Sequence, residues 1–296
     1  MVTTAPADIS TKSKGSVLST IISFTRKHPL GAAGAIIVII MILAAIFADF
    51  LTAYDPEQID FEAMLVPPNW VHPLGTDNYG RDLLTRCIYG ARTALVVGFV
   101  AAFVGASIGL ILGVASAYFG GSFDLVFQRV MDVFLAFPLI ILALAVVAVL
   151  GTGTENVIVA ITIPFIPQCA RVVRSSALSI REIPYIDAAR VAGYSNARII
   201  LRHMAPNVMA PFLIMVTAFV GQAILLEASL SYLGLGVQEP VPAWGLMLQG
   251  GAEEYAESAP WVAIFPGLAI TLAVFAFNLF GDALRDVLDP KLRAQI

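Results

Sequence analysis

The sequence predicts an all-α integral membrane protein with six transmembrane helices. Three observations support this fold class: 58% of the 296 residues are apolar, only 13% are charged, and several apolar runs reach about the length of a membrane span. Soluble domains carry about 25% charged residues. A helix of about 20 apolar residues crosses the roughly 30 Å hydrocarbon core of a bilayer. A large soluble helical bundle would need charged faces at helical period, and these are missing.

Six apolar runs give the expected transmembrane helices. Pro138 in the third run and Pro164 and Pro167 in the fourth predict kinks, because proline removes a backbone donor from the helix. The expected spans are Gly31–Phe50, Thr93–Tyr118, Val130–Leu150, Val157–Leu178, Met209–Leu233 and Trp261–Phe280.

Small residues in the second span predict close packing against another helix. Gly105, Gly109 and Gly113 follow one another at intervals of four residues. This spacing leaves a groove into which a second helix can approach closely. It indicates a packed bundle and little about function.

The distribution of basic residues predicts the orientation in the membrane. If the N-terminus is cytoplasmic, 14 of the 17 Lys and Arg residues fall inside, and only Arg81, Arg86 and Arg92 fall outside. Basic residues favour the cytoplasmic side, so both termini are expected there. The expected organisation begins with a cytoplasmic tail (1–28), followed by the first transmembrane helix with its external loop (29–92). A core of five helices (93–282) and a cytoplasmic C-terminal tail (283–296) complete the chain. The core includes a cytoplasmic loop (179–208) and an external loop (234–260).

The two external loops are longer than a helix connection needs. They carry acidic residues, prolines and tryptophans, which is consistent either with a docking surface for another protein or with solvated loops anchored by interfacial tryptophans. The candidate docking residues are Asp77, Arg81, Asp82, Trp244, Glu253 and Glu254.

Polar groups within apolar segments are candidates for a translocation path, because burying them in a membrane is costly. Asp132 lies near the inner end of the third span, where Arg129 three residues before it could form a surface ion pair instead. Glu227 in the fifth span is either a buried hydrogen-bonding group or a pore-lining group. Asn278 in the sixth span is the third candidate.

The sequence gives no support for catalysis or for a metal site. It contains no GxxxxGK[ST] phosphate loop, no HExxH motif and no CxxC motif, so we predict no catalytic residues and no cofactor bound by this chain. His72 and Asp77 could share a metal ion, but the Pro, Gly, Asn and Asp residues around them favour a structured turn. The net charge of −4 argues against nucleic acid as a partner.

The segment between the fourth and fifth spans is the most informative part of the chain. Pro184 is placed to begin a helix, Gly193 can adopt the left-handed conformation that ends it, and Ser195 can cap a second helix. Pro206 is expected to break the chain before the fifth span. On the first helix Tyr185, Ala188, Ala189 and Ala192 share one face of small residues edged by an aromatic ring.

Two interpretations of this segment remain open from spacing alone. A face of small residues can fit closely into a cleft of another protein. Alternatively, the segment is an interfacial amphipathic hairpin whose Arg198 and Arg202 face lipid phosphates.

At these residues the sequence resembles the permease subunits of ATP-binding-cassette importers. Their cytoplasmic loop has the pattern EAA, three residues, Gly, nine residues, then I-x-L-P. Asp187, Ala188 and Ala189, then Gly193, and then the segment 203–206 align with it without a gap. The chain departs from the pattern with Asp for Glu, His203 for Ile and Ala205 for Leu.

Further segments resemble the dipeptide, oligopeptide and nickel branch of that family, and in particular its second permease. The resemblance covers nearly all of residues 20–293. The matching segments are HPLGTDNYGRDLLTRCIYGARTAL (72–95), YFGGSFDLVFQRVMDVFLAFP (118–138), SYLGLGVQEPVPAWGLML (231–248) and FNLFGDALRDVLDPKLR (277–293).

The resemblance implies the type I importer permease fold in a bacterial plasma membrane. It also implies four partner subunits: a second homologous permease, two ATPases that bind ATP and Mg²⁺, and an extracytoplasmic binding protein. The segment 185–193 would be the coupling helix that contacts an ATPase, with Arg190 and Arg198 as polar contacts. Dipeptides or oligopeptides would be the substrate, with nickel or glutathione as alternatives. A self-sufficient channel or secondary transporter would show midplane charges or an inverted repeat, and neither is evident.

Overall fold

The computed structural model describes residues 24–288, and within them the regular structure is helical. The expected tails 1–28 and 283–296 lie largely outside the described residues. The α-helices are α2 (Pro29–Ile46), α3 (Ala48–Leu51), α4 (Leu83–Phe119), α5 (Gly121–Leu135), α6 (Leu139–Leu150), α7 (Thr154–Arg181), α8 (Pro184–Val191), α9 (Asn196–Ile199), α10 (Met209–Tyr232), α11 (Trp244–Glu254) and α12 (Trp261–Leu288). A 3₁₀ turn η1 (Phe61–Ala63), a π-helical turn η2 (Ile200–Met204) and a second 3₁₀ turn η3 (Ala205–Val208) complete the order.

Five helical segments in the described residues are long and apolar enough to cross a membrane. They are α2, α4, α7, the continuous stretch Asn196–Tyr232 that contains α10, and α12. The bent pair α5 and α6 passes the same test when it is taken as one span, which gives up to six. Five of the predicted spans therefore coincide with single helices or helical stretches.

The predicted third span is not one continuous helix. α5 ends at Leu135, α6 begins at Leu139, and the two axes meet at 88°. Pro138 supplies no backbone N–H and disfavours the helical conformation at Phe137 before it. The kink expected at Pro138 is thus present, and it is sharp enough to divide the span. α7, by contrast, continues through Pro164 and Pro167 as one helix.

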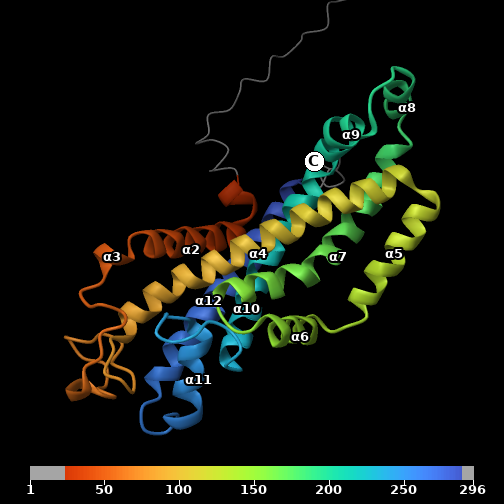
Figure 1. Ribbon diagram of the computed structural model, residues 1–296. Helices are drawn as coiled ribbons and strands as arrows, with labels where there is room; N and C mark the ends of the chain where they lie inside the picture. The colour runs from red at the N-terminus through yellow and green to blue at the C-terminus, as the bar shows by residue number, and fades with distance from the viewer. Residues whose placement is uncertain (1–23, 289–296) are drawn as a thin grey trace, which may run out of the picture.

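The long helices lie side by side in one bundle, with α4 at its centre (Figure 1). α4 packs along α7 through the three glycines that the sequence singled out. A Cβ on Gly105 would stand 2.9 Å from Phe165 Cβ, one on Gly109 would stand 2.7 Å from Cys169 Cβ, and one on Gly113 would stand 2.5 Å from the carbonyl oxygen of Ala170. Only glycine allows the two backbones to come so close, so the predicted groove is confirmed.

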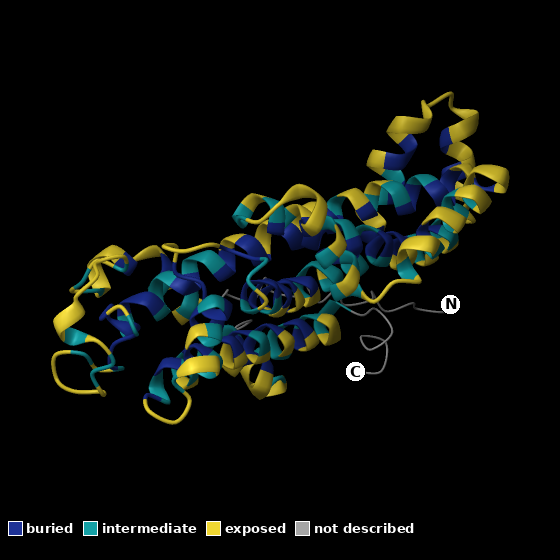
Figure 2. Ribbon diagram, turned by 60° about the horizontal axis from the view of Figure 1, so that its bottom comes forward, coloured by how far each residue is buried: buried dark blue, intermediate teal, exposed yellow. Residues whose placement is uncertain are grey.

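The molecule is elongated and has a different polar structure at each end. α8 and α9 project beyond the bundle at one end, and α3, α11 and the loops beside them close the other (Figure 1). Exposed residues gather at both ends and along the outer faces of the long helices (Figure 2). On α2 these outer faces carry large apolar side chains such as Ile36, Ile39 and Ile40, each more than half exposed. Such a surface suits contact with lipid rather than water.

α4 begins ten residues before the predicted span. Asp82 caps it by accepting hydrogen bonds from the backbone N–H of Thr85 and from the hydroxyl of Thr85, both at 2.8 Å. The helix therefore extends through polar sequence that hydropathy alone assigns to a loop. α11 lies inside the predicted external loop 234–260, which we expected only as a loop.

Candidate functional site

The first candidate site is the loop between α7 and α10, which we call the α8–α9 loop (residues 182–208). α8 begins at Pro184 as predicted, and Gly193 follows its end with a φ of +77°. The N–H of Tyr194 then donates to the carbonyl oxygen of Ala189 at 3.2 Å, which closes the helix end. Ser195 caps α9 by accepting a hydrogen bond from the N–H of Arg198 at 3.4 Å. The predicted helix start at Pro184, the predicted helix end at Gly193 and the predicted N-cap at Ser195 are all confirmed.

Pro206 does not break the chain before α10, so that prediction is wrong. The backbone passes from α9 through the π-helical turn η2 and the 3₁₀ turn η3 into α10 without leaving a helical path. The change of helix type accommodates Pro206, because it falls in the first turn of η3, where a backbone N–H is not needed. The α8–α9 loop is consequently joined to α10 by a continuous helical stretch.

Hydrogen bonds close the α8–α9 loop on itself. The hydroxyl of Tyr185 donates to the carbonyl oxygen of His203 at 2.8 Å. The side-chain amide of Asn207 donates to the same carbonyl at 2.7 Å and to the Tyr185 hydroxyl at 3.1 Å. Ile186 and Ile199 are fully buried beneath these contacts. The loop therefore has a small apolar core and a defined shape of its own.

The end of α4 holds the α8–α9 loop to the bundle. The hydroxyl of Tyr118 donates to the side-chain carbonyl of Asn196 at 2.7 Å. The guanidinium of Arg190 lies over the Tyr118 ring, 5.1 Å from its centroid. Arg181 at the end of α7 donates to the carbonyl oxygen of Ala117 at 3.0 Å. Tyr118 thus joins the α8–α9 loop to α4, and Arg181 joins α4 to α7.

The small-residue face of α8 is turned partly toward the rest of the loop. Ala189 is buried, whereas Ala188 and Ala192 are exposed. A shallow cavity of about 360 Å³ lies against this face. It is lined by Tyr185, Ala188, Ala189, Ala192, Tyr194, Arg202, His203 and Asn207. The face is therefore one wall of a pocket and not a flat outer surface.

The predicted polar contacts of the loop are exposed. Arg190 donates to Asp187 Oδ1 at 2.9 Å, one helical turn apart. The guanidinium of Arg198 stacks on the ring of Tyr194 at 4.2 Å. All three charged side chains can be reached from outside the chain.

At the α11 end, four charged residues form a cluster that joins the two long loops. Arg81 Nε donates to Asp77 Oδ2 at 2.7 Å, and Arg81 Nη1 donates to Glu239 Oε2 at 2.7 Å. Arg86 lies behind them, fully buried, with Nη2 at 3.4 Å from Glu239 Oε2 and Nε at 3.7 Å from Asp77 Oδ2. The pairing of Arg81 with Glu239 connects positions that are 158 residues apart. We call this group the ion cluster (Asp77, Arg81, Arg86 and Glu239).

Arg81 and Glu239 stabilise each other's charged forms in this cluster. Burial raises the pKa of Glu239, but the hydrogen bond from Arg81 and the positive charge of Arg86 outweigh it, so this pKa lies below its usual range. Burial likewise lowers the pKa of Arg81, but the hydrogen bond to Glu239 and the charge of Asp77 outweigh it and raise that pKa.

Most of the predicted docking residues at this end have buried side chains. Asp77, Arg81 and Asp82 are each less than 7% exposed, and Trp244 is 3% exposed. The indole of Trp244 packs on Gly90 and donates to the carbonyl oxygen of Cys87 at 2.9 Å. The interpretation of these four side chains as a contact surface therefore needs correction, because their contacts lie within the chain. Glu253 and Glu254 are exposed.

The turn around His72 is structured, and His72 does not pair with Asp77. Its Nδ1 lies 3.0 Å from Asp82 Oδ1, and the Asp77 carboxylate accepts from the N–H groups of Tyr79 and Arg81. Within residues 24–288 no group of three or more His, Cys, Asp or Glu side chains could hold a metal ion.

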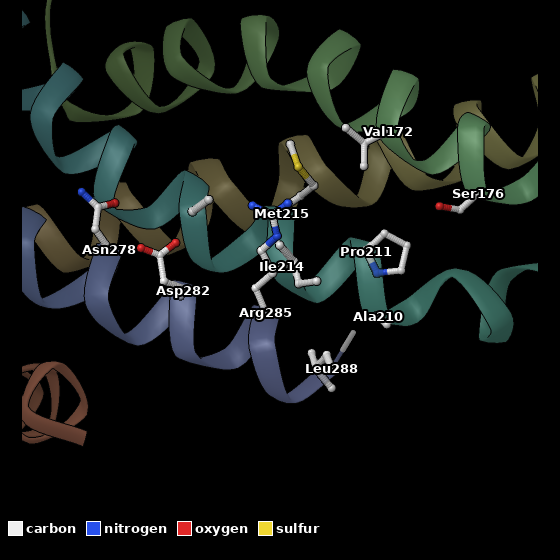
Figure 3. A pocket seen from close by; sticks show the side chains of 12 residues that line it. Val172, Ser176, Ala210, Pro211, Ile214, Met215, Asn278, Asp282, Arg285 and Leu288 are labelled. Atoms are coloured by element: carbon white, nitrogen blue, oxygen red, sulfur yellow. The ribbon is translucent and has the colours of Figure 1, made fainter. Parts of the chain in front are cut away.

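The three candidates for a translocation path do not lie at one site. Asp132 pairs with Arg129 at 3.5 Å, as the sequence allowed, and also with Arg171 of α7. Glu227 is 1% exposed and accepts a 2.7 Å hydrogen bond from the Ser231 hydroxyl, which favours its structural role. Asn278 lines a cavity between α7, α10 and α12 (Figure 3).

Sequence reasoning missed a second ion pair that joins α5 to α7. Arg174 Nε donates to Asp124 Oδ1 at 2.6 Å, and the Ser116 hydroxyl donates to the same carboxylate oxygen. Asp124 and Arg174 are 50 residues apart, so no local pattern reveals the pair.

Comparisons with known proteins agree with this arrangement. Residues 105–294 match the family described as "Binding-protein-dependent transport system inner membrane component", and residues 20–68 match the "N-terminal TM domain of oligopeptide transport permease C". The inward-facing MetNI methionine ABC transporter has a chain of the same fold, with a TM-score of 0.56 at 20% identity over 70% of this chain and 98% of that chain.

Similar sequences cover most of the chain. A putative peptide transport system permease protein of Brucella suis is 45% identical over 88% of both chains. A dipeptide transport system permease protein of Alkalihalophilus pseudofirmus is 44% identical over 91% of this chain and 88% of its own length. A glutathione transport system permease protein of Shigella flexneri is 46% identical over 91% of this chain and 89% of its own length. With a family match over well over half of its length, this chain belongs to the inner membrane components of binding-protein-dependent transport systems, the permeases of ATP-binding-cassette importers.

Proposed function

We propose that the chain is one permease subunit of an ATP-driven importer that takes up dipeptides or oligopeptides. The observation that carries this proposal is the α8–α9 loop, a self-contained polar element that projects from an apolar bundle and continues helically into α10. The chain has no phosphate loop of its own. A separate motor protein must therefore act on it. The peptide substrate rests on the relatives named for peptide and dipeptide transport.

We further propose six membrane spans with both termini in the cytoplasm. α5 and α6 would together form the third span, with their bend at membrane depth. The basic residues support this orientation, because 14 of 17 fall on the side that carries the α8–α9 loop. The α11 end then faces outward, which suits a multi-pass protein of the bacterial plasma membrane.

In the proposed complex the chain pairs with a second, homologous permease. Two ATPases bind ATP and Mg²⁺ on the cytoplasmic side, and one of them contacts the α8–α9 loop through Asp187, Arg190 and Arg198. An extracytoplasmic binding protein delivers the substrate to the α11 end, where Glu253 and Glu254 are exposed. This chain binds no cofactor in the proposal.

The contacts around the α8–α9 loop suggest how a movement of α8 would be transmitted to the long helices of the bundle. A movement of α8 imposed by the ATPase reaches α4 through Tyr118, and α4 is joined in turn to α7 through Arg181. The same movement reaches α10 along the helical stretch 196–232. The three helices that this loop holds together would then tilt as a unit, which opens the bundle to one side of the membrane or the other.

One experiment separates this function from a self-sufficient transporter. The chain is reconstituted in liposomes alone, and in parallel together with its permease and ATPase partners and the binding protein. We expect uptake of radiolabelled dialanine only in the complete system and only with ATP. Uptake by the chain alone would contradict the proposal. If the complete system imported glutathione with ATP but did not import dialanine, the proposed importer architecture would stand. The substrate would then be glutathione, which is named for the Shigella flexneri relative.

A further inference from the structure

A cavity between α7, α10 and α12 carries chemistry that the coupling function does not use. Its volume is about 500 Å³ (Figure 3). Its lining residues come from the parts of α7 and α10 nearest the α8–α9 loop and from the last turns of α12. The walls are mostly apolar and include Pro211, Ile214 and Met215. No residue of the central helix α4 is among those that line it.

Four polar side chains line this cavity. Ser176 comes from α7, and Asn278, Asp282 and Arg285 come from successive turns of α12 (Figure 3). Within residues 24–288 none of the four side chains has a hydrogen bond or an ion pair, and the side chains of Asn278, Asp282 and Arg285 are exposed to the cavity. They are therefore free to bind a ligand.

Asp282 and Arg285 form no ion pair, unlike a second Asp and Arg with the same spacing in this chain. Asp187 and Arg190 have the same order and spacing on α8, and their side chains pair at 2.9 Å. Opposite charges three residues apart on a helix normally meet in this way. Asp282 and Arg285 line the same cavity without pairing, so the cavity contains one negative and one positive group.

This pair of charges selects among classes of ligand. A divalent metal ion would find one carboxylate and would be repelled by Arg285. An anion such as a lipid phosphate would bind Arg285 and would be repelled by Asp282. A ligand with a free ammonium group and a free carboxylate satisfies both, and guanidinium groups bind carboxylates with two parallel hydrogen bonds.

We propose that this cavity is a transient binding site for a zwitterionic peptide during its passage through the transporter. Asp282 accepts hydrogen bonds from the peptide ammonium group, and Arg285 donates to the terminal carboxylate. The inference rests on the proposed function and adds to it the recognition of both peptide termini by this chain.

The exposure of both charges makes the site weak, as a transit site must be. Ion pairs that remain in contact with water contribute little free energy, because water competes for both groups. A peptide held in this way is oriented but still released, which allows passage toward the cytoplasm.

The test uses the complete transporter in lipid nanodiscs without its binding protein. Binding of radiolabelled dialanine is measured by equilibrium dialysis, beside N-acetyl-dialanine amide, which has neither terminal charge. The variants are Asp282→Asn and Arg285→Gln. Asp286→Asn is the matched control, because it makes the same change as Asp282→Asn four residues further along α12, where Asp286 lies 3.7 Å from His28 instead of in the cavity.

We expect each cavity variant to weaken dialanine binding by up to about fivefold, because an ion pair exposed to water contributes at most about 1 kcal/mol, and we expect Asp286→Asn to bind dialanine as the wild type does. The blocked peptide should bind weakly to the wild type and to every variant. The double exchange Asp282→Arg with Arg285→Asp should restore part of the binding, because it again offers one charge of each sign.

Three results would overturn the inference. If both cavity variants bound dialanine with the affinity of the wild type, the proposed peptide site would be excluded, whereas the proposed importer function would not be affected. A loss in Arg285→Gln alone would indicate a site for an anion. A wild-type transporter that neither binds nor imports dialanine would contradict both this site and the peptide importer function.

Discussion

The hydroxyl of Tyr118, at the end of α4, donates a 2.7 Å hydrogen bond to the side-chain carbonyl of Asn196, the first residue of α9. This bond joins the central helix of the bundle directly to the α8–α9 loop. The Tyr118 ring also lies beneath the guanidinium of Arg190. One side chain thus contacts both helices of the loop.

Replacing Tyr118 with Phe should loosen the coupling between ATP hydrolysis and uptake. The variant keeps the ring beneath Arg190 and removes only the bond to Asn196. A hydrogen bond of this kind contributes about 1 kcal/mol, which corresponds to a roughly fivefold change. We expect substrate uptake per ATP hydrolysed to fall by up to about that factor in proteoliposomes. Tyr232→Phe is the matched control, since no hydrogen bond of the Tyr232 side chain occurs within residues 24–288. An equal loss in both variants would contradict the role of Tyr118.

Replacing Gly193 with Val should abolish ATP-driven uptake while the chain still inserts into the membrane. Gly193 has a φ of +77°, and a Cβ there would meet no atom within 4 Å. The effect is therefore backbone strain alone, on the order of 1–2 kcal/mol or more for a β-branched residue. That strain would reorient α8 relative to α9.

The control for Gly193 is Gly234→Val at the other end of the molecule. Gly234 has a φ of +73° and equally open surroundings, so the two variants carry the same strain at different places. Uptake should be lost only in Gly193→Val, whereas assembled amounts of both proteins should be similar on a native gel. Normal uptake by Gly193→Val would refute the assignment of the loop to coupling.

Local signals in the sequence were enough to predict the α8–α9 loop. Pro184, Gly193 and Ser195 each act on the backbone within one or two residues, so their effects do not depend on the rest of the fold. The glycines of α4 were equally informative, because their spacing alone creates the groove for α7. The helical passage through Pro206 was not predictable in this way, since it depends on a change of helix type.

Contacts between residues that are far apart in the sequence could not be predicted. The pairing of Arg81 with Glu239 spans 158 residues, and nothing near either residue points to the other. The sequence therefore placed Asp77 and Arg81 on an exposed loop, whereas their mutual pairing allows them to be buried. The cavity at Asn278 likewise arises only where three helices meet.

Neutralising Glu239 should destabilise the α11 end in a pH-dependent manner. Its pKa is lowered from an ordinary value of 4.5, because Arg81 and Arg86 outweigh the effect of burial. A carboxylate whose pKa is lower in the folded state stabilises the fold above the unfolded pKa, and this contribution is lost as the pH falls through the folded value. The melting temperature of the wild type in detergent should therefore drop as the pH falls below about 4.5.

Glu239→Gln should melt at a lower temperature than the wild type at pH 7, and the difference should shrink as the pH falls toward 3. Glu257→Gln is the control, because Glu257 is exposed and within residues 24–288 takes part in no ion pair. A difference between wild type and Glu239→Gln that stayed constant over the whole pH range would show that charge is not what the ion cluster contributes.

Adding a side chain at Gly109 should destabilise the bundle. The new Cβ of Gly109→Ala would stand 2.7 Å from Cys169 Cβ and 2.8 Å from the carbonyl oxygen of Ile166, so α4 and α7 would have to move apart. Overpacking of this kind costs about 1–3 kcal/mol, which should appear as a lower melting temperature of the purified chain. Gly250→Ala in α11 serves as the control, because a Cβ at Gly250 meets nothing within 4 Å and alanine favours a helix by about 1 kcal/mol over glycine. We expect Gly250→Ala to melt at or above the wild-type temperature, and a Gly109→Ala variant as stable as that control would mean that α4 and α7 do not need the glycine contact.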